Sequence, residues 1–160
     1  MAKAGYTALT PSTVSLTANG TKTILGAFVP AALGFGLDLK KIRIGFGGTS
    51  GAPALVGLMV GPYTTNPPPE TGTAPATPVT PQQVYGRTIA PGFLAAHTWT
   101  AEPTGMTLID SWLLTPNGGL VMYDIPLGDT PDCAPGNGFS LLVNSPIAVG
   151  VRAGFWLERC

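Results

Sequence analysis

The residue types that most often carry out acid–base or nucleophilic chemistry are scarce in this sequence. His97 is the only histidine, which excludes a histidine-rich metal centre, and a lone histidine is typical of a structural or surface position. Ser50 lies in Gly48-Thr-Ser-Gly51, close to the Gly-x-Ser-x-Gly turn of serine hydrolases, but Ala52 stands where the last glycine belongs. No spacing links a serine, a histidine and an aspartate into a triad. The sequence therefore predicts no catalytic residue.

Carboxylates offer two other kinds of chemistry. Asp129 and Asp132 share a turn-rich segment and could help to bind calcium, but Asp-Thr-Pro-Asp lacks the ligand density of a calcium-binding loop. Asp110 and Asp124 fall on two consecutive predicted strands, where they could be cross-strand neighbours. Paired carboxylates hydrolyse glycosides, but structural or surface roles are favoured for these residues. We predict no metal ligand among them.

Cys133 and Cys160 are the only cysteines. Two cysteines are too few for a disulfide scaffold, and their spacing fits no zinc pattern. We expect reduced thiols, although a disulfide formed late is compatible with the sequence. Phe46-Gly-Gly48 is no phosphate loop, because no Gly-Lys-Ser/Thr follows it. The sequence therefore predicts no cofactor.

Aromatic side chains are the remaining group that could bind a ligand. A platform for stacked sugar rings could be built from Trp99, Trp112, Trp156, Tyr63, Tyr85 and Tyr123. Aromatic residues also serve as core and interface anchors, and we favour that interpretation. Trp156 lies opposite the apolar face of its predicted strand, and it is our candidate for a subunit interface.

Charged residues make up only 10% of the sequence, against about 25% in average proteins. A folded monomer of this size exposes roughly 7,500 Å², which leaves one charge for each roughly 470 Å². Sparse charge and a formal net charge of zero favour association. We therefore expect partners to cover much of the surface. The alternative is a neutral polar surface built from the abundant threonine, with serine, asparagine and glutamine.

Nucleic acid and membrane are not expected partners. Binding to phosphates needs clustered basic residues, and only Lys40-Lys41-x-Arg43 comes close, as the solvated face of a strand. No run of about 20 apolar residues predicts a membrane span. The segment Met1–Tyr6 has no apolar stretch of the kind found in signal peptides, so we expect synthesis in the cytoplasm.

The elements that must position these residues are strands, because apolar residues alternate with a period of two. Ile42, Ile44 and Phe46 share one face, and Lys41 and Arg43 share the other. Strands are expected at 21–28, 41–46, 54–60, 107–115, 120–125, 138–144 and 149–157, with weaker ones at 84–88 and 97–100. This spacing predicts an all-β fold in one domain over residues 1–160: an antiparallel β-sandwich, with jelly-roll-like connectivity favoured.

One predicted strand and one predicted turn carry further expectations. Ala54–Val60 is apolar on both faces, which is typical of a central strand or of one covered by a neighbour. Pro116-Asn-Gly-Gly119 is a strong turn signal, and it predicts a hairpin between the strands on either side of it.

The segment 64–83 is rich in proline and threonine and has no apolar periodicity. Its prolines favour an extended conformation and remove backbone donors; they are Pro67, Pro68, Pro69, Pro75, Pro78 and Pro81. A stiff arm of this kind loses less conformational entropy on docking than a flexible linker. We predict that these prolines form an arm on a neighbouring subunit, with a disordered solvent loop as the alternative.

Four patches of strand and turn carry a family likeness. They are Gly5-Tyr-Thr-Ala-Leu9, Trp99-Thr-Ala-Glu-Pro-Thr104, the run from Ser111 to Gly128 (SWLLTPNGGLVMYDIPLG) and the closing Phe155-Trp-Leu-Glu158. In these patches the chain resembles a group of small structural proteins from the virions of tailed bacteriophages. The resemblance implies a β-rich component of the auxiliary capsid or decoration kind, and it brings no catalytic residue.

We therefore expect a non-enzymatic virion protein, assembled in the host cytoplasm, that cements the capsid by binding across neighbouring shell subunits. Its expected partners are the major capsid protein or other virion proteins and further copies of itself, with a trimer favoured. The alternative is a tail or fibre module that binds host-surface glycans. An enzyme would need a cleft with convergent polar groups, which the residues above do not predict.

Overall fold

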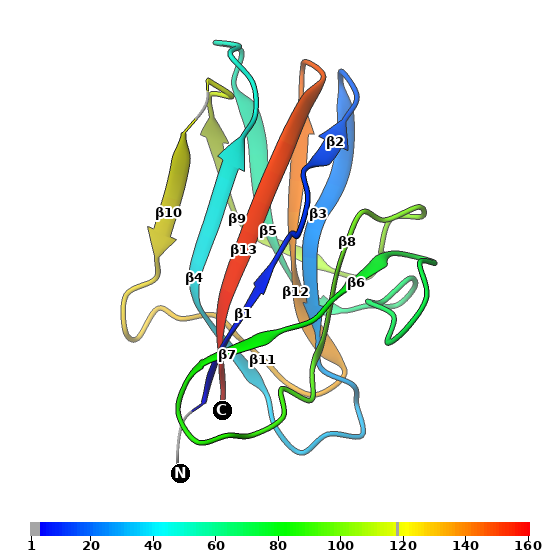
Figure 1. The fold of residues 1–160 in the computed structure, drawn as a ribbon, viewed down its shortest axis with the longest axis vertical. Coiled ribbons are helices and arrows are strands. Elements are labelled where there is room, and N and C mark those ends of the chain that lie inside the picture. The colour runs from blue at the N-terminus through cyan, green and yellow to red at the C-terminus, as the bar shows by residue number, and fades with distance from the viewer. Residues whose placement is uncertain (1–3, 118) are drawn as a thin grey trace.

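The computed structural model describes residues 4–117 and 119–160, and these ranges contain thirteen strands and no helix. Two antiparallel sheets pack face to face, which confirms the predicted all-β sandwich (Figure 1). The strands are β1 (Gly5–Leu9), β2 (Val14–Leu16), β3 (Gly20–Phe28), β4 (Leu37–Phe46), β5 (Ala54–Pro62), β6 (Thr77–Val79), β7 (Gln82–Tyr85), β8 (Leu94–His97), β9 (Thr107–Leu114), β10 (Leu120–Asp124), β11 (Asp132–Cys133), β12 (Asn137–Ser145) and β13 (Val149–Arg159).

The seven-stranded sheet has the order β10-β4-β13-β1-β7, with β11 beside β4 and β2 beside β13. Its two long central strands place their apolar residues opposite one another, as in the pairs Phe155–Ile42 and Ala153–Ile44. All four side chains are buried between the sheets, because every second residue of a strand points to the same face. The alternation predicted for both strands is therefore confirmed.

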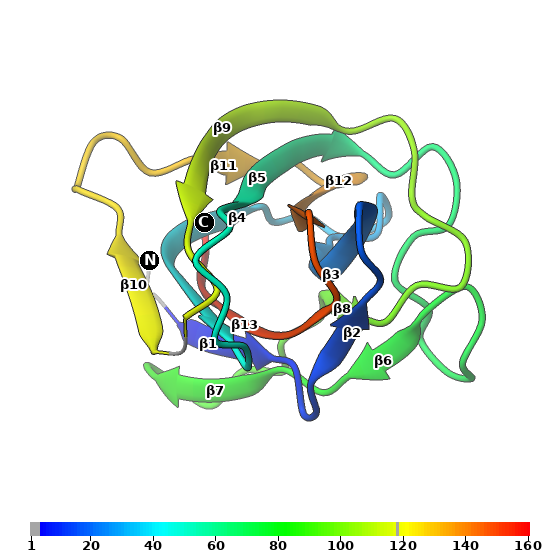
Figure 2. The same ribbon diagram turned by 90° about the horizontal axis from the view of Figure 1, so that it is seen from above.

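The six-stranded sheet has the order β6-β8-β3-β12-β5-β9. Leu25, Leu141 and Leu58 stand side by side across its three central strands and are buried in the core between the sheets. The strand predicted at 54–60 is central, as expected, because β5 lies between β12 and β9. Figure 2 shows the two sheets facing each other around this core.

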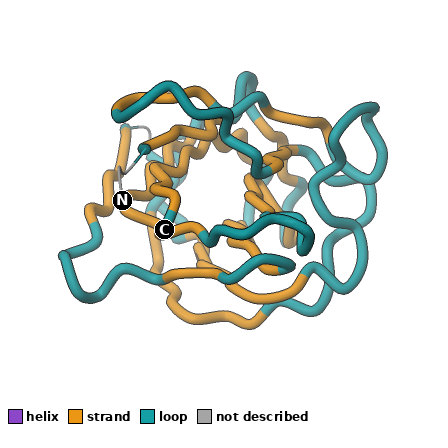
Figure 3. The backbone as a smooth tube through the Cα atoms, turned by 90° about the horizontal axis from the view of Figure 1, so that it is seen from below, coloured by secondary structure: helices purple, strands orange, loops and turns teal. Residues whose placement is uncertain are grey.

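The Pro-rich segment lies against its own chain. It pairs with the six-stranded sheet through β6 and with the seven-stranded sheet through β7 (Figure 2). One of its prolines, Pro68, is buried, and the others are half-buried: Pro67, Pro69, Pro75, Pro78 and Pro81. The loops around it gather on the side of the molecule that carries β6 and β8 (Figure 3). The role of these prolines in a subunit interface stays a prediction.

The predicted hairpin at 116–119 is wrong. β9 pairs with β5 in one sheet, whereas β10 pairs with β4 in the other, so the turn crosses between the sheets; Gly118 itself lies outside the described residues. The two strands complete the edges of different sheets on the same side of the sandwich (Figure 2). A turn signal fixes where the chain reverses, but it does not determine which strand the next one joins.

Two weaker strands lie a few residues before their predicted positions. The strand expected at 84–88 is β7, which ends just before Gly86, and the strand expected at 97–100 is β8, which ends just before Thr98. Both following residues have a positive φ, 97° for Gly86 and 52° for Thr98. This backbone conformation leaves the β region and so ends each strand.

Candidate interaction surfaces

The residues considered for nucleophilic catalysis do not meet. His97 is buried at the end of β8, and its Nδ1 lies 2.7 Å from the hydroxyl of Thr98. Burial lowers the pKa of His97, because a desolvated site disfavours the imidazolium. Ser50 lies in the β4–β5 loop, which is at the top of the sandwich in Figure 1. Its hydroxyl accepts a hydrogen bond from the backbone amide of Ala52. This is a local turn rather than a nucleophile elbow.

Asp110 and Asp124 are not cross-strand neighbours. Asp110 stands opposite Leu58 on β5, whereas Asp124 stands opposite Lys41 on β4 and forms an ion pair with it at 2.7 Å. The two carboxylates belong to different sheets because β9 and β10 do. Among the described residues, no group of three or more histidine, cysteine, aspartate or glutamate side chains could hold a metal ion.

A second group of charges lies at the start of β4. Lys40 contacts Asp38 at 2.9 Å and the buried Glu158 at 3.3 Å. Burial, the largest single influence, lowers the pKa of Lys40, but its hydrogen bonds and charge attraction to Asp38 and Glu158 outweigh burial and the net shift is upward. A lysine held between two carboxylates satisfies charges that would be costly to bury alone.

Both cysteines are free. Cys133 is buried, and burial raises the pKa of its thiol to about 12. Cys160 is exposed, yet partial burial and the nearby Asp38 carboxylate also raise its pKa. Reactive cysteines have a lowered pKa, so neither thiol has the environment of a nucleophile.

The six aromatic residues considered for sugar stacking do not form one platform in the structure. Trp99 and Tyr63 are buried under the Pro-rich segment, where the Tyr63 hydroxyl donates to the carbonyl of Phe139 at 2.8 Å. Trp156 is half-buried, with the guanidinium of Arg43 3.9 Å above its ring. These positions are typical of anchors and cation–π contacts.

Two of the six are in contact at the edge where β9 and β10 lie. The rings of Trp112 and Tyr123 are 5.8 Å apart. Tyr123 also borders a groove of about 310 Å³ together with Asp110. An aromatic ring beside a carboxylate has the chemistry of a sugar-binding site.

The outer face of the six-stranded sheet carries a larger apolar surface over β5 and β9. Leu55 and Leu113 stand opposite each other in register, with exposed fractions of 44% and 64%, and Leu108 is 50% exposed. A groove of about 410 Å³ is bordered by two of these side chains, Leu55 and Leu108. Its lining includes no charged residue: Thr21, Leu55, Gly57, Met59, Leu108, Ser111, Leu142 and Asn144. We call this surface the β5–β9 face.

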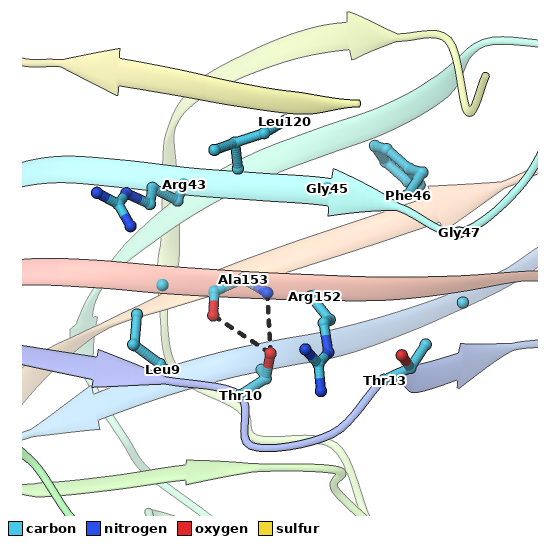
Figure 4. A pocket seen from close by; sticks show the side chains of 12 residues that line it. Leu9, Thr10, Thr13, Arg43, Gly45, Phe46, Gly47, Leu120, Arg152 and Ala153 are labelled. Atoms are coloured by element: carbon cyan, nitrogen blue, oxygen red, sulfur yellow. Dashed lines mark hydrogen bonds between the residues drawn. The ribbon is translucent and has the colours of Figure 1, made fainter. Parts of the chain in front are cut away.

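A second concave surface lies on the outer face of the seven-stranded sheet, and we call it the glycine trough. Its floor is formed by Gly45 of β4, by Gly47 just after the end of β4, and by Gly150 and Gly154 along β13. It encloses about 390 Å³, and Figure 4 shows the side chains that border it. A strand with glycine on its outer positions has no side chains there, which leaves the backbone open to a partner.

The walls of the glycine trough come from neighbouring strands. Leu120 of β10 borders it beyond β4, and Leu9 and Thr13 border it beyond β13 (Figure 4). The Thr10 hydroxyl accepts a hydrogen bond from the Ala153 amide at 3.0 Å and holds the end of β1 against β13. A β-carbon at Gly154 would displace the end of the Leu9 side chain, which lies close over this glycine.

Sequence analysis identified neither surface as a site. The available signal was the position of glycine at 150 and 154 on the outer face of an otherwise regular alternating strand. The same signal recurs at 45 on the neighbouring strand, but the pairing of β4 with β13 is needed to place the glycines side by side.

No helix that could cross a membrane is present in the described part of the chain. Comparisons with protein-family models, with curated protein sequences and with solved structures found no match to this chain.

Proposed function

We propose that this chain is a non-enzymatic structural protein of a tailed-bacteriophage virion, which decorates the capsid by binding across neighbouring shell subunits. The observation that carries the proposal is the β5–β9 face, an exposed apolar surface whose groove has no charged lining. Exposed apolar patches typically mark binding surfaces. The resemblance of the chain to small virion proteins supplies the kind of partner.

The proposed mechanism is apolar burial repeated over a lattice. Covering Leu55, Leu108 and Leu113 removes apolar surface from water, which contributes about 25 cal/mol per Å². An interface of standard size buries on the order of 1,600 Å². Where several linked copies bind a repeating shell, each further contact is effectively intramolecular, so modest single contacts add up to firm attachment.

The proposed partners are the major capsid protein or other virion proteins, together with further copies of this chain in a homo-oligomer, a trimer being favoured. The proposed location is the virion, assembled in the host cytoplasm. Sparse charge supports protein partners over nucleic acid, because binding to phosphates depends on clustered basic side chains.

We also propose that the sandwich is of the jelly-roll kind. Support comes from the order of its eight main strands, which divide into β10-β4-β13-β1 in one sheet and β9-β5-β12-β3 in the other. Consecutive members of this set alternate between the sheets, apart from the pair β5–β9, and the first strand pairs with the last. Two sheets of four strands built in this way match the eight-stranded jelly roll.

The test is binding to shells assembled from the major capsid protein of the same virus. Purified protein should sediment with these shells, and replacing Leu108 and Leu113 together with serine should weaken binding by about tenfold or more. Val84→Ser is the matched control, because Val84 is similarly exposed but lies on β7, away from this face. Absence of the wild-type protein from shells, or equal loss in the control, would contradict the proposal.

A tail or fibre module that binds host-surface glycans is the second candidate. The Trp112–Tyr123 ring pair beside Asp110 favours it. The two proposals differ in copy number: decoration predicts about as many copies per particle as the major capsid protein, whereas a tail position predicts few. A glycan array that compares the wild-type protein with Tyr123→Ala tests the second candidate directly. If Tyr123 stacks on a bound sugar, the variant should lose the binding signal that the wild-type protein gives.

A further inference from the structure

The loop between β10 and β11 presents an apolar side chain at its tip. Leu127 has an exposed fraction of 92%, the highest among the large hydrophobic residues of the described chain. The loop is held in shape at its base, where Pro126 accepts hydrogen bonds from the Asp129 amide at 3.1 Å and from the Thr130 hydroxyl at 3.4 Å. A leucine exposed to this extent buries little of its side chain against the described part of its own subunit. We call residues 126–130 the Leu127 turn.

The Leu127 turn also carries an unpaired negative charge. Asp129 lies two residues beyond the leucine, and within the described ranges its carboxylate forms no ion pair or hydrogen bond. The turn therefore offers an apolar knob with an anion beside it.

The glycine trough combines apolar walls with charge of the opposite sign. Its apolar walls are Leu9 and Leu120, and it is bordered by the two cations Arg43 and Arg152. Neither guanidinium contacts a carboxylate of the described chain: Arg152 donates to the carbonyl of Pro11 at 2.9 Å, and Arg43 stacks on an aromatic ring. The Nε of Arg43 is buried and has no hydrogen-bond partner. This arrangement suits an apolar group accompanied by an anion.

We propose that the Leu127 turn of one copy inserts into the glycine trough of a second copy, with Leu127 between Leu9 and Leu120 and Asp129 against Arg152. The inference rests on the proposed homo-oligomer and names its contact. Every copy carries both halves, and their shape and charge are complementary. Because knob and trough are different surfaces, the contact is heterologous, so it closes into a ring, such as the favoured trimer, or continues as a filament.

The first test fills the trough. A β-carbon at Gly47 would have its nearest neighbour at 3.7 Å, so Gly47→Leu is accommodated by the subunit while its side chain occupies the site of the incoming leucine. Gly34→Leu is the matched control, because Gly34 has no atom within 4 Å of a β-carbon and does not line the trough. In sedimentation velocity we expect the dissociation constant of the oligomer to rise by about tenfold or more in Gly47→Leu and to stay unchanged in Gly34→Leu.

The second test exchanges the charges. Asp129→Arg and Arg152→Asp should each weaken self-association by about tenfold, and the double variant should recover most of the loss. Recovery cannot arise from misfolding, because a second damaging substitution would only add to the damage. Self-association that is unchanged in both single variants, or a double variant no better than its parents, would overturn the inference, as would a monomeric wild-type protein at micromolar concentration.

Shell binding separates this inference from the proposed function. If Gly47→Leu remains oligomeric but no longer binds shells, the trough holds a segment of the shell protein, and only the inference fails. If the wild-type protein associates through the charge pair but never binds shells, the proposed function fails and the inference stands.

Discussion

The two halves of the outer face of the six-stranded sheet have similar apolar residues, but one half is covered by the chain and the other is exposed. Over β3 and β8, the Pro-rich segment and Trp99 cover the sheet and form a small second core with Tyr63, Ala76 and Ala96. Over β5 and β9, no segment of the described chain covers Leu55, Leu108 and Leu113, which remain exposed. One half is therefore protected by its own chain, and the other is free to bind a partner.

Glycines on the sheet illustrate the difference. A β-carbon at Gly26 would lie 2.7 Å from the indole of Trp99, which is itself 2% exposed and fixed in place. A β-carbon at Gly57, on the bare half, would lie at the same distance from the end of the Leu108 side chain, which is free to move into solvent. The covered half is a packed core, whereas the bare half tolerates rearrangement.

The largest expected effect comes from removing the anchor of the covered half. Trp99→Ala should lower the free energy of unfolding by about 3–5 kcal/mol, because the indole fills the second core and its Nε1 donates to the carbonyl of Asn66 at 3.0 Å. Urea unfolding measures the loss. Limited proteolysis should also show new cleavage between residues 66 and 83. Unchanged stability would mean that the Pro-rich segment is not held by this contact.

A smaller effect is expected where the covering loop meets β3. The Glu102 carboxylate accepts a hydrogen bond from the buried Thr23 amide at 2.8 Å, so Glu102→Ala leaves that donor unpaired and should cost about 1–3 kcal/mol. Glu102→Gln is the matched control, since its side-chain carbonyl retains an acceptor. Urea unfolding compares the two variants, and an equal loss in both would show that charge rather than the hydrogen bond is responsible.

The edge strand β10 offers a weaker interaction. Asp124→Asn removes the ion pair with Lys41, both of whose side chains are partly exposed, and should cost about 0.2–1 kcal/mol. The difference from wild type should disappear at a salt concentration of about 1 M, where exposed charges are screened. A loss that persists in high salt would mean that the aspartate contributes through a contact other than this pair.

The smallest expected effect on stability lies on the bare half. Leu113→Ser should change the free energy of unfolding by no more than about 0.5 kcal/mol, because the side chain has few packing partners to lose. The same substitution should measurably reduce shell binding. A large loss of stability would show that the β5–β9 face belongs to the core of the subunit, and the contrast between the two halves would not hold.

The sandwich was predictable because alternation is a local property. Ile42, Ile44 and Phe46 face the core as their spacing requires, and so do the apolar residues of 149–157. The pairing of strands was less predictable. Pro116–Gly119 indicated a turn, yet β9 and β10 joined different sheets, since pairing depends on which distant edges are available.

The candidate surfaces were harder to predict than the fold. Proline content predicted an extended segment at 64–83, but composition holds no information on whether such a segment docks on its own subunit or on a neighbour. The glycine trough needs β4 and β13 to be adjacent, and these strands are more than 100 residues apart. Long-range contacts of this kind are set by the global packing of the chain.

The sequence by itself determined that the chain forms strands with one apolar face, that it carries few charges, and that it has a single histidine, because these depend on residue type and local spacing. Only the tertiary structure decided which apolar surfaces remain in water. Exposure depends on which segment folds over which sheet: Trp99 and the prolines cover one half of a face, whereas Leu108, Leu113 and Leu127 are left without a cover.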